Sequence, residues 1–415
     1  MLPAMKDMPY HIGVTMKLYP STWQKHLIAV NDGAKRAVRN LLVAYGNERY
    51  QLSKTVAFVP AYRDRIDFLD SVRKSVAGIK NALPFLYGKD VDEQCIANAV
   101  KNYRTAWKNQ KERHTGVPTF IKKSADQSYQ TNAHYYPNGS TNVRFTDRCH
   151  VMLPKLGRVR CAGSPKYVEM MMARCDVRIG AVTIRKDAVR EYWVSFSLGS
   201  EMPFRTPLPR TGSMIGIDLN LIDLVNTSDG MAVPNERFLV TSAEKLAKQQ
   251  RKLSRKYEAS KNSSRSRWQI HAYQQQRIKV AYTHRKISRQ REDYLHRISK
   301  HLIENQDVIA AEDLKVRNLI KDHHLVRAIT DAGWRTLLTM LQYKSAFYGK
   351  RVVLVPPQNT TQTCSCCGYI LKGEERLTLI DRDWTCPNCR TYHLRDVNAA
   401  NVILKKGLAI LATGG

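Results

Sequence analysis

The chain has 415 residues, 43% of them hydrophobic, so it is long enough to form two or three domains with ordinary cores. Its 67 lysine and arginine residues against 36 acidic residues give a formal charge of +31, which excludes a typical enzyme of small metabolites and favours nucleic acid over a membrane surface as the polyanionic partner. No apolar run approaches the ~20 residues that cross a bilayer, and the N-terminal residues lack a signal peptide's apolar core, so we expect no membrane partner and a cytoplasmic location.

The N-terminal part predicts a strand followed by a block of helices. Residues 12–18 alternate apolar and polar side chains, as a half-buried strand does. Ser21 can cap the helix that follows, because apolar or small residues recur at steps of three and four as far as Ala44. Further helical patterns cover residues 64–82 and 91–109.

Between about residues 117 and 200, short apolar runs are separated by proline and glycine, a pattern typical of β-strands. The predicted strands are residues 117–121, 143–145, 151–153, 177–184 and 192–198. They indicate a small β-barrel, into which the helical block would be inserted after the first strand. Residues 208–212 predict a linker, after which the second half begins.

Residues 244–303 are helical in pattern and strongly basic. A Ser-Lys-Asn-Ser-Ser stretch beginning at Ser260 interrupts the pattern, which predicts a helical hairpin or a bent pair of helices. Cations far outnumber acids in this segment, so few intrahelical ion pairs can balance them. Contact with a phosphate backbone is therefore favoured over a merely solvated helix face.

Three acidic residues in the second half stand in contexts that suit a shared metal site. Asp218 and Glu312 each end a short apolar run, where a buried strand would deliver a carboxylate to the rim of a sheet, and Asp396 opens an alanine-rich helical segment. Residues 214–225 predict a strand hairpin, and residues 308–311 predict a third strand. This order of acids matches the ribonuclease H-like architecture of RuvC-type nucleases. Three carboxylates can hold two Mg²⁺ ions about 3.5–4 Å apart, which would activate water for phosphodiester hydrolysis.

Other polar residues beside these acids allow more than one interpretation. Arg395 and Asn398 flank Asp396 and could contact the scissile phosphate or a metal-bound water, or form a surface salt bridge instead. Asp313 would point away from its neighbour Glu312 on a continuing strand, so we expect it to be a turn or helix-capping residue.

Five of the nine cysteines crowd into one short segment. Cys364 and Cys367 form one Cys-x₂-Cys pair, and Cys386 and Cys389 form a second pair after 18 intervening residues. This spacing predicts a zinc ribbon, in which four thiolates complete a closed, structural Zn²⁺ site. Cys366 is the surplus thiol, because a pair made with it would leave only one intervening residue. Loss of zinc should disorder this insert and misplace Asp396.

Several motifs around these residues resemble the TnpB family of transposon-associated, RNA-guided nucleases, which are related to the compact type V CRISPR effectors. The matching segments of the second half are Gly216–Leu219, Ala311–Leu314, Asp331–Trp334, Thr363–Gly368, Cys386–Cys389 and His393–Ala400. Two positions depart from the family pattern: Asn220 stands where a glycine is usual, and Leu394 stands where an acidic residue is common.

The resemblance implies an α+β multidomain fold and a set of partners. Residues 1–20 and 111–207 would form a wedge-like β-barrel, residues 21–110 a helical recognition insertion, residues 213–360 and 391–415 a ribonuclease H-like RuvC domain, and residues 361–390 a zinc-ribbon insert that binds the target nucleic acid. It also implies a bound guide RNA, a double-stranded DNA target in a prokaryotic cytosol or nucleoid, and Mg²⁺-dependent cleavage at one RuvC site. The sequence leaves the oligomeric state open, with one protein monomer per guide RNA favoured.

Two other functions remain open from the sequence. A guide-dependent DNA-binding protein could repress or target without cutting, but such a protein would be expected to have lost catalytic acids. A DNA transposase would share the ribonuclease H-like fold and the acids, although the zinc insert between the second and third acids argues against it.

Overall fold

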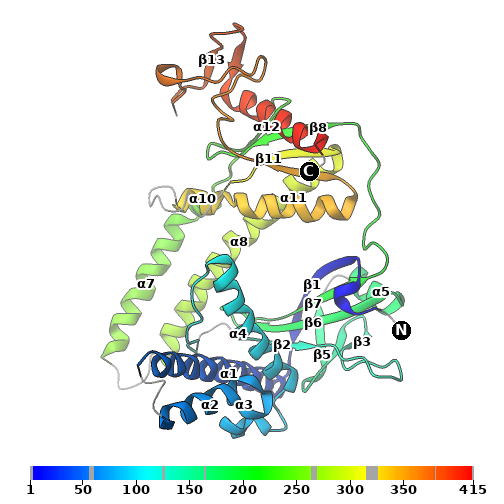
Figure 1. Ribbon diagram of the computed structural model, residues 1–415, viewed down its shortest axis with the longest axis vertical. Helices are drawn as coiled ribbons and strands as arrows, with labels where there is room; N and C mark the ends of the chain where they lie inside the picture. The colour runs from blue at the N-terminus through cyan, green and yellow to red at the C-terminus, as the bar shows by residue number, and fades with distance from the viewer. Residues whose placement is uncertain are drawn as a thin grey trace. The chain divides into compact units, whose positions relative to one another are not determined.

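The computed structural model has an α+β fold and describes residues 3–55, 60–123, 127–162, 165–262, 269–314, 326–378 and 380–413 (Figure 1). The chain divides into two compact units, Met1–Phe204 and Arg205–Gly415, and the boundary falls just before the predicted linker. Within the described residues, no helix is both long enough and apolar enough to cross a membrane.

The first unit contains a seven-stranded sheet in which all neighbouring strands are antiparallel. Its strands are β1 (Tyr10–Tyr19), β2 (Gln127–Asn132), β3 (Arg144–Asp147), β4 (His150–Leu153), β5 (Gly157–Ala162), β6 (Val177–Lys186) and β7 (Tyr192–Ser200). Their order is β2-β6-β7-β1-β5-β4-β3, so the first strand of the chain lies in the middle. The edge strands β2 and β3 do not pair with each other in this order, and the described sheet is open where the sequence predicted a barrel.

Four of the five strands predicted between residues 117 and 200 are confirmed, and residues 117–121 are not a strand. Val117 and Phe120 are exposed there, and the side chain of Asn40 takes over the hydrogen bonds that a neighbouring strand would make. Its Oδ1 accepts from Ile121 N at 2.8 Å and its Nδ2 donates to Ile121 O at 3.1 Å. The polar strand β2 was missed because only Tyr129 and Thr131 are buried in it.

The helical block lies between β1 and β2, as predicted. It consists of α1 (Thr22–Thr55), α2 (Pro60–Lys74), α3 (Val76–Ala82), the 3₁₀ turn η2 (Pro84–Tyr87) and α4 (Glu93–Arg113). Ser21 starts α1 with a reciprocal cap: Gln24 N donates to Ser21 Oγ at 3.2 Å, and Ser21 N donates to Gln24 Oε1 at 2.9 Å. The same unit also holds η1 (Met5–Asp7) and α5 (Pro165–Ala173), which the sequence patterns did not predict.

The second unit is built on a five-stranded mixed sheet. Its strands are β8 (Met214–Asp218), β9 (Asp223–Thr227), β10 (Ala232–Pro234), β11 (Val308–Glu312) and β12 (Arg351–Val355), in the order β10-β9-β8-β11-β12. The first three strands are antiparallel, whereas β8, β11 and β12 run parallel. The predicted hairpin and third strand are thereby confirmed.

Helices cover both faces of this sheet (Figure 1). The helices of this unit are α6 (Phe238–Thr241), α7 (Ala243–Lys261), α8 (His271–Asn305), α10 (Val326–Ala332), α11 (Trp334–Tyr348) and α12 (Arg395–Ala412). Of these, α12 packs on one face of the sheet and α11 with the C-terminal part of α8 on the other, whereas α7 packs on α8. The basic segment forms the helix pair α7 and α8, as predicted, and the interrupting stretch lies partly outside the described residues. A small two-stranded sheet, β13 (Asp383–Thr385) and β14 (Tyr392–Leu394), and the 3₁₀ turn η3 (Gly373–Glu375) lie between β12 and α12.

The two faces of β8 separate the two helical layers. Ile215 and Ile217 are buried in a core shared with α8 and α11, whereas Gly216 between them faces α12. A Cβ at Gly216 would lie only 2.0 Å from the carbonyl oxygen of Ala400 in α12. Glycine is therefore required at this position so that α12 can lie directly on β8.

We expect the Gly216→Ala variant to be strongly destabilised, because the added methyl group must push α12 away from the sheet. Overpacking of this kind costs about 1–3 kcal/mol or more, and a thermal unfolding curve would measure it. The matched control is Gly13→Ala in strand β1, where an added Cβ meets no atom within 4 Å. Equal unfolding temperatures for the two variants would contradict the close packing of α12.

Candidate catalytic and metal sites

Asp218 and Glu312 lie side by side at the carboxyl ends of two adjacent parallel strands. In the register of β8 and β11, Ile217 stands opposite Ala311, so the next residue of each strand is one of the two acids. Both residues are only 7% exposed. Because alternate residues of a strand share a face, Asp218 lies on the face of Gly216, which α12 covers.

Asp396 reaches the same place from the first turn of α12. Two neighbours hold its carboxylate: Arg395 Nε donates to Oδ1 at 3.1 Å, and Asn220 Nδ2 donates to Oδ2 at 3.3 Å. Asn220 belongs to the loop that follows Asp218, so the loop after β8 and the start of α12 meet at this carboxylate. The three acids predicted from the sequence are thus brought to one edge of the sheet.

The orientation of the Asn220 side chain follows from its other hydrogen bonds. Its Oδ1 accepts from the backbone N–H groups of Ile222 and Asp223, both at 2.9 Å. The oxygen must face these donors, which leaves Nδ2 free to donate to Asp396. Sequence reasoning noted Asn220 only as a departure from the family glycine and missed this role.

Burial and neighbouring charges act on the carboxylates of Asp218 and Glu312. The pKa of Asp218 is raised to about 7, mainly by burial and then by the negative charges of Glu312 and Asp396, with the cation of Arg395 opposing the rise. Burial also raises the pKa of Glu312, although a hydrogen bond from the Thr360 hydroxyl opposes this. A divalent cation would remove the repulsion, since oxygen ligands suit Mg²⁺.

The four predicted zinc ligands form a tighter cluster. The sulfur atoms of Cys364, Cys367, Cys386 and Cys389 all lie within 4.8 Å of one another, and within the described part of the chain this is the one such group of potential metal ligands. The three carboxylates are therefore more widely spaced than the thiols. This is compatible with two ions, because ligands on opposite sides of an ion pair about 4 Å wide need not touch.

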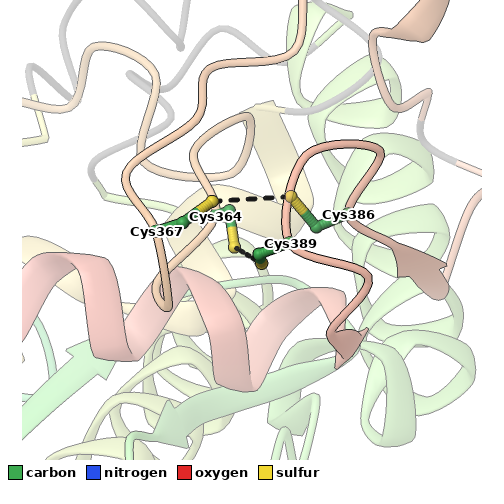
Figure 2. Close-up of side chains that lie close together, drawn as sticks. All are labelled: Cys364, Cys367, Cys386 and Cys389. Atoms are coloured by element: carbon green, nitrogen blue, oxygen red, sulfur yellow. Dashed lines mark hydrogen bonds between the residues drawn. The ribbon is translucent and has the colours of Figure 1, made fainter.

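Figure 2 shows the two cysteine pairs facing each other from two loops. The Cys364–Cys389 and Cys367–Cys386 sulfur distances are 3.6 Å and 3.7 Å. Tetrahedral zinc with Zn–S bonds of about 2.3 Å requires sulfur atoms about 3.8 Å apart, so the cluster fits this ion with little movement. Cys366 is exposed and lies outside the cluster, as predicted.

Both loops make the same turn around their cysteines. In each loop, the residue after the second cysteine donates its N–H to the carbonyl of the first cysteine at 2.9 Å: Gly368 to Cys364 and Arg390 to Cys386. Both donors have positive φ, 78° for Gly368 and 63° for Arg390. This repetition indicates two equivalent knuckles shaped to present four sulfur atoms inward.

The surroundings of Cys364 and Cys389 shift the pKa values of their thiols in opposite directions. Burial raises the pKa of the Cys364 thiol to about 12, whereas hydrogen bonds with Thr391 lower the pKa of Cys389 to about 6. His393 Nε2 lies 3.1 Å from Cys364 Sγ and could donate to that sulfur. A bound cation would stabilise the buried thiolate as well, because metal binding displaces the thiol proton.

Asn398 joins the first knuckle to α12 and does not lie at the carboxylates. Its Oδ1 accepts from Ser365 N and its Nδ2 donates to Thr363 O, both at 2.8 Å, and the residue is 2% exposed. The sequence allowed contact with the scissile phosphate or a metal-bound water, or a surface salt bridge, and the burial of Asn398 excludes the surface alternative. Arg395 instead pairs with Asp396 and donates to Thr378 O at 3.1 Å.

Known proteins resemble this chain along most of its length. Residues 193–322 match the OrfB_IS605 family model, described as "Probable transposase", and residues 334–403 match a model described as "Cas12f1-like, TNB domain". The Escherichia coli K12 protein named "Putative RNA-guided DNA endonuclease InsQ" is 31% identical over 350 residues, which cover 81% of this chain and 79% of that protein. This chain belongs to the TnpB family.

One further relative of this TnpB-family chain and one solved structure extend the comparison. A Streptomyces pristinaespiralis protein named "Putative RNA-guided DNA endonuclease" is 38% identical over 56% of this chain, but the match spans only 54% of that relative. The fold resembles Cas12f1 in a complex with single guide RNA and target DNA, with a TM-score of 0.53 and 12% identity over 95% of this chain and 98% of the other. The similarity in structure supports the α+β fold.

The stability of this TnpB-family chain should depend on pH when metal is absent. An acid whose pKa is raised in the folded chain contributes its full stabilisation at a pH below its unfolded-state pKa of ~4. For Asp218 this contribution is lost as the pH rises through about 7. We therefore expect Asp218→Asn to unfold at a higher temperature than the parent at pH 8 in buffer without Mg²⁺, with the difference disappearing near pH 4. Asp313→Asn, which changes the exposed acid next to Glu312, is the control. An Asp218→Asn variant that is less stable than the parent at pH 8 would contradict the argument.

The zinc assignment predicts the metal content of purified protein. The parent should contain one zinc ion per chain, and the double variant Cys386→Ser, Cys389→Ser should contain little, because two of four ligands are lost. Cys366→Ser is the matched control and should keep its zinc. Elemental analysis by mass spectrometry measures all three proteins; a zinc content that depends on Cys366 would overturn the chosen ligand set.

Proposed function

We propose that the protein is an RNA-guided DNA endonuclease that hydrolyses phosphodiester bonds of target DNA at one two-metal RuvC-type site. The observation that carries the proposal is the convergence of Asp218, Glu312 and Asp396 on the α12 face of the sheet. Three like charges brought together, two of them on buried residues, are costly to maintain unless they serve a ligand. The names of the relatives from E. coli and Streptomyces support the same activity.

The topology of the second unit supports a ribonuclease H-like fold for this domain. Three antiparallel strands are followed by two parallel ones, and the acids stand on β8, on β11 and at the start of α12. This is the order of acids that the sequence interpretation requires. We assign residues 213–360 and 391–415 to this domain, and residues 361–390 to a zinc-ribbon insert that contacts target nucleic acid.

Each residue of the site has a role in the proposed reaction. The three acids would hold Mg²⁺, which supplies an activated water and neutralises charge on the leaving 3′ oxygen when bound. Asn220 and Arg395 hold the two oxygens of Asp396, and Thr360 orients Glu312 from the other side. These hydrogen bonds keep the ligands in position before metal arrives.

The basic surface supports a nucleic-acid complex that is larger than the cut site. The chain carries a formal charge of +31, and the helix pair α7 and α8 presents many of the cations. We assign to residues 1–20 and 111–207 a wedge-like role and to residues 21–110 a recognition role toward a guide RNA. Guide pairing would supply sequence specificity, while the protein holds the backbone of the heteroduplex.

A transposase is the second candidate, favoured by the description of the family model matched by residues 193–322. The same three carboxylates could join DNA ends. Strand-transfer products formed without RNA would support this candidate, whereas cleavage that requires a guide RNA would exclude it.

Cleavage by the guide RNA complex should depend on each acid. We expect Asp218→Asn, Glu312→Gln and Asp396→Asn to slow cutting at least about 100-fold, because each change removes a charged metal ligand. Target binding, measured by gel shift, should stay near the parental level. Asp313→Asn, an exposed acid beside Glu312, should cut normally. Parental cutting by Asp218→Asn at equal binding would refute the assignment of the site.

A further inference from the structure

A cavity of about 530 Å³ opens at the edge of the sheet that carries the acids. Leu221 lines it from the loop that follows β8. Leu239, Val240 and Ala243 line it from α6 and the start of α7, and Arg327 from the first turn of α10. Ligands of sheets with parallel strands bind beyond the carboxyl ends of those strands, where loops of this kind meet. The cavity is in such a place, and the proposed mechanism does not use it.

The walls of the cavity combine apolar side chains with two guanidinium groups. Leu221, Leu239 and Val240 supply aliphatic surface, and Val240 is 65% exposed. Arg237 and Arg327 add positive charge, and both side chains are exposed. An apolar cavity with two cations at its walls suits a flat ligand with an apolar face and a negative charge.

The one carboxylate among the lining residues is already engaged. Both oxygens of Asp331 accept from the N–H of Leu239, at 3.1 Å and 2.9 Å, and Arg291 lies 3.7 Å from Oδ1. Asp331 is 5% exposed and thus serves the packing of α6. The charge available to a ligand is therefore positive, which favours phosphate.

The same loop connects the cavity to the candidate catalytic carboxylates. The carbonyl of Leu221 accepts from Asn235 Nδ2 at 3.1 Å and from Arg237 Nη2 at 3.3 Å. The preceding residue, Asn220, donates to Asp396. Consecutive Cα atoms are about 3.8 Å apart, so one residue of this loop faces the cavity while its neighbour touches a metal ligand.

Arg237 also has a backbone conformation that is uncommon outside glycine. Its φ is 47°, in the left-handed region, and Asn235 Oδ1 accepts from its N–H at 3.3 Å. Such strain is retained where surrounding contacts require it, and it often marks a functional position. Here it sets the arginine between the loop after β8 and the start of α6.

We infer that the cavity binds one unstacked base of the DNA strand that is being cut, with Arg237 and Arg327 on the neighbouring phosphates. The inference rests on the proposed function, because it takes the strand at the carboxylates to be DNA. A base inside a duplex cannot enter such a cavity, so the strand must be single at this point. The bound base would fix which phosphate lies against the acids.

Abasic substitution tests this inference in the complete complex with guide RNA. Targets that lack a single base are cut at each position near the scissile bond. One position should slow the parent about tenfold, as loss of one base contact does. Ala243→Leu, which narrows the cavity with a helix-favouring side chain, should slow cutting of the intact target and should show no additional loss at that position. Ala272→Leu on the exposed side of α8 is the matched control.

A second pair of variants tests the phosphate contacts. Arg237→Ala and Arg327→Ala should each weaken binding of the target and reduce its salt dependence by about one phosphate contact. The control is Arg335→Ala, which removes an exposed arginine of α11 outside the cavity and should weaken target binding less. The inference would be overturned if Arg237→Ala and Arg327→Ala both bind and cut the target as the parent does. It would also be overturned if Ala243→Leu is still slowed further by the missing base at the sensitive position.

A binding measurement separates this inference from the proposed function. The target carries 2-aminopurine at the sensitive position, or at each position in turn if the parent does not cut. The complex with Asp218→Asn should change its fluorescence at one position, and adding Ala243→Leu should abolish that change. If the parent complex does not cut but the fluorescence change is still seen, the result contradicts the proposed nuclease activity and leaves the base-binding cavity supported. Absence of the signal at every position, or tight calorimetric binding of AMP or TMP to the RNA-free protein, would reject the strand subsite.

Discussion

The contact between α12 and β8 holds the candidate catalytic centre together. Gly216 has no side chain, so the backbone of Ala400 approaches the strand directly, and Gly407 allows the same approach to Ala310 of β11. Asp396 begins the helix that these contacts hold down. Any larger residue at the two glycines would lift the helix, and the helix acid would then separate from the acids of both strands.

A second constraint opposes this close packing. Burial, and then the charges of Glu312 and Asp396, raise the pKa of Asp218, and the fold must tolerate the repulsion whenever no cation is present. Asn220 and Arg395 relieve part of it, because each donates a hydrogen bond to a different oxygen of Asp396. Metal binding and stability of the fold are therefore linked, since an ion that binds only the folded chain stabilises it.

The acids and the cysteine pairs could be predicted from the sequence because their chemistry permits few alternatives. Thiols at a fixed spacing and acids at strand ends are recognisable within short windows. Asn220 and Asn398 could not be assigned in this way. Their side chains bond to residues 176 and 33–35 positions away, and nothing local in the sequence indicates such partners. For the same reason the missed strand β2 became visible only as a partner of β6.

The zinc knuckles and the candidate catalytic centre share one helix. Asn398 holds the first knuckle through two backbone hydrogen bonds, and Lys405 donates to Ser365 O about two turns further along α12. Asp396 lies two residues before Asn398, and both residues are in the first turn of α12. A knuckle ordered by zinc therefore supports the helix end that carries the acid, and a disordered knuckle removes that support. If both metal assignments hold, the position of the candidate ligand Asp396 depends on a zinc site that takes no part in the chemistry.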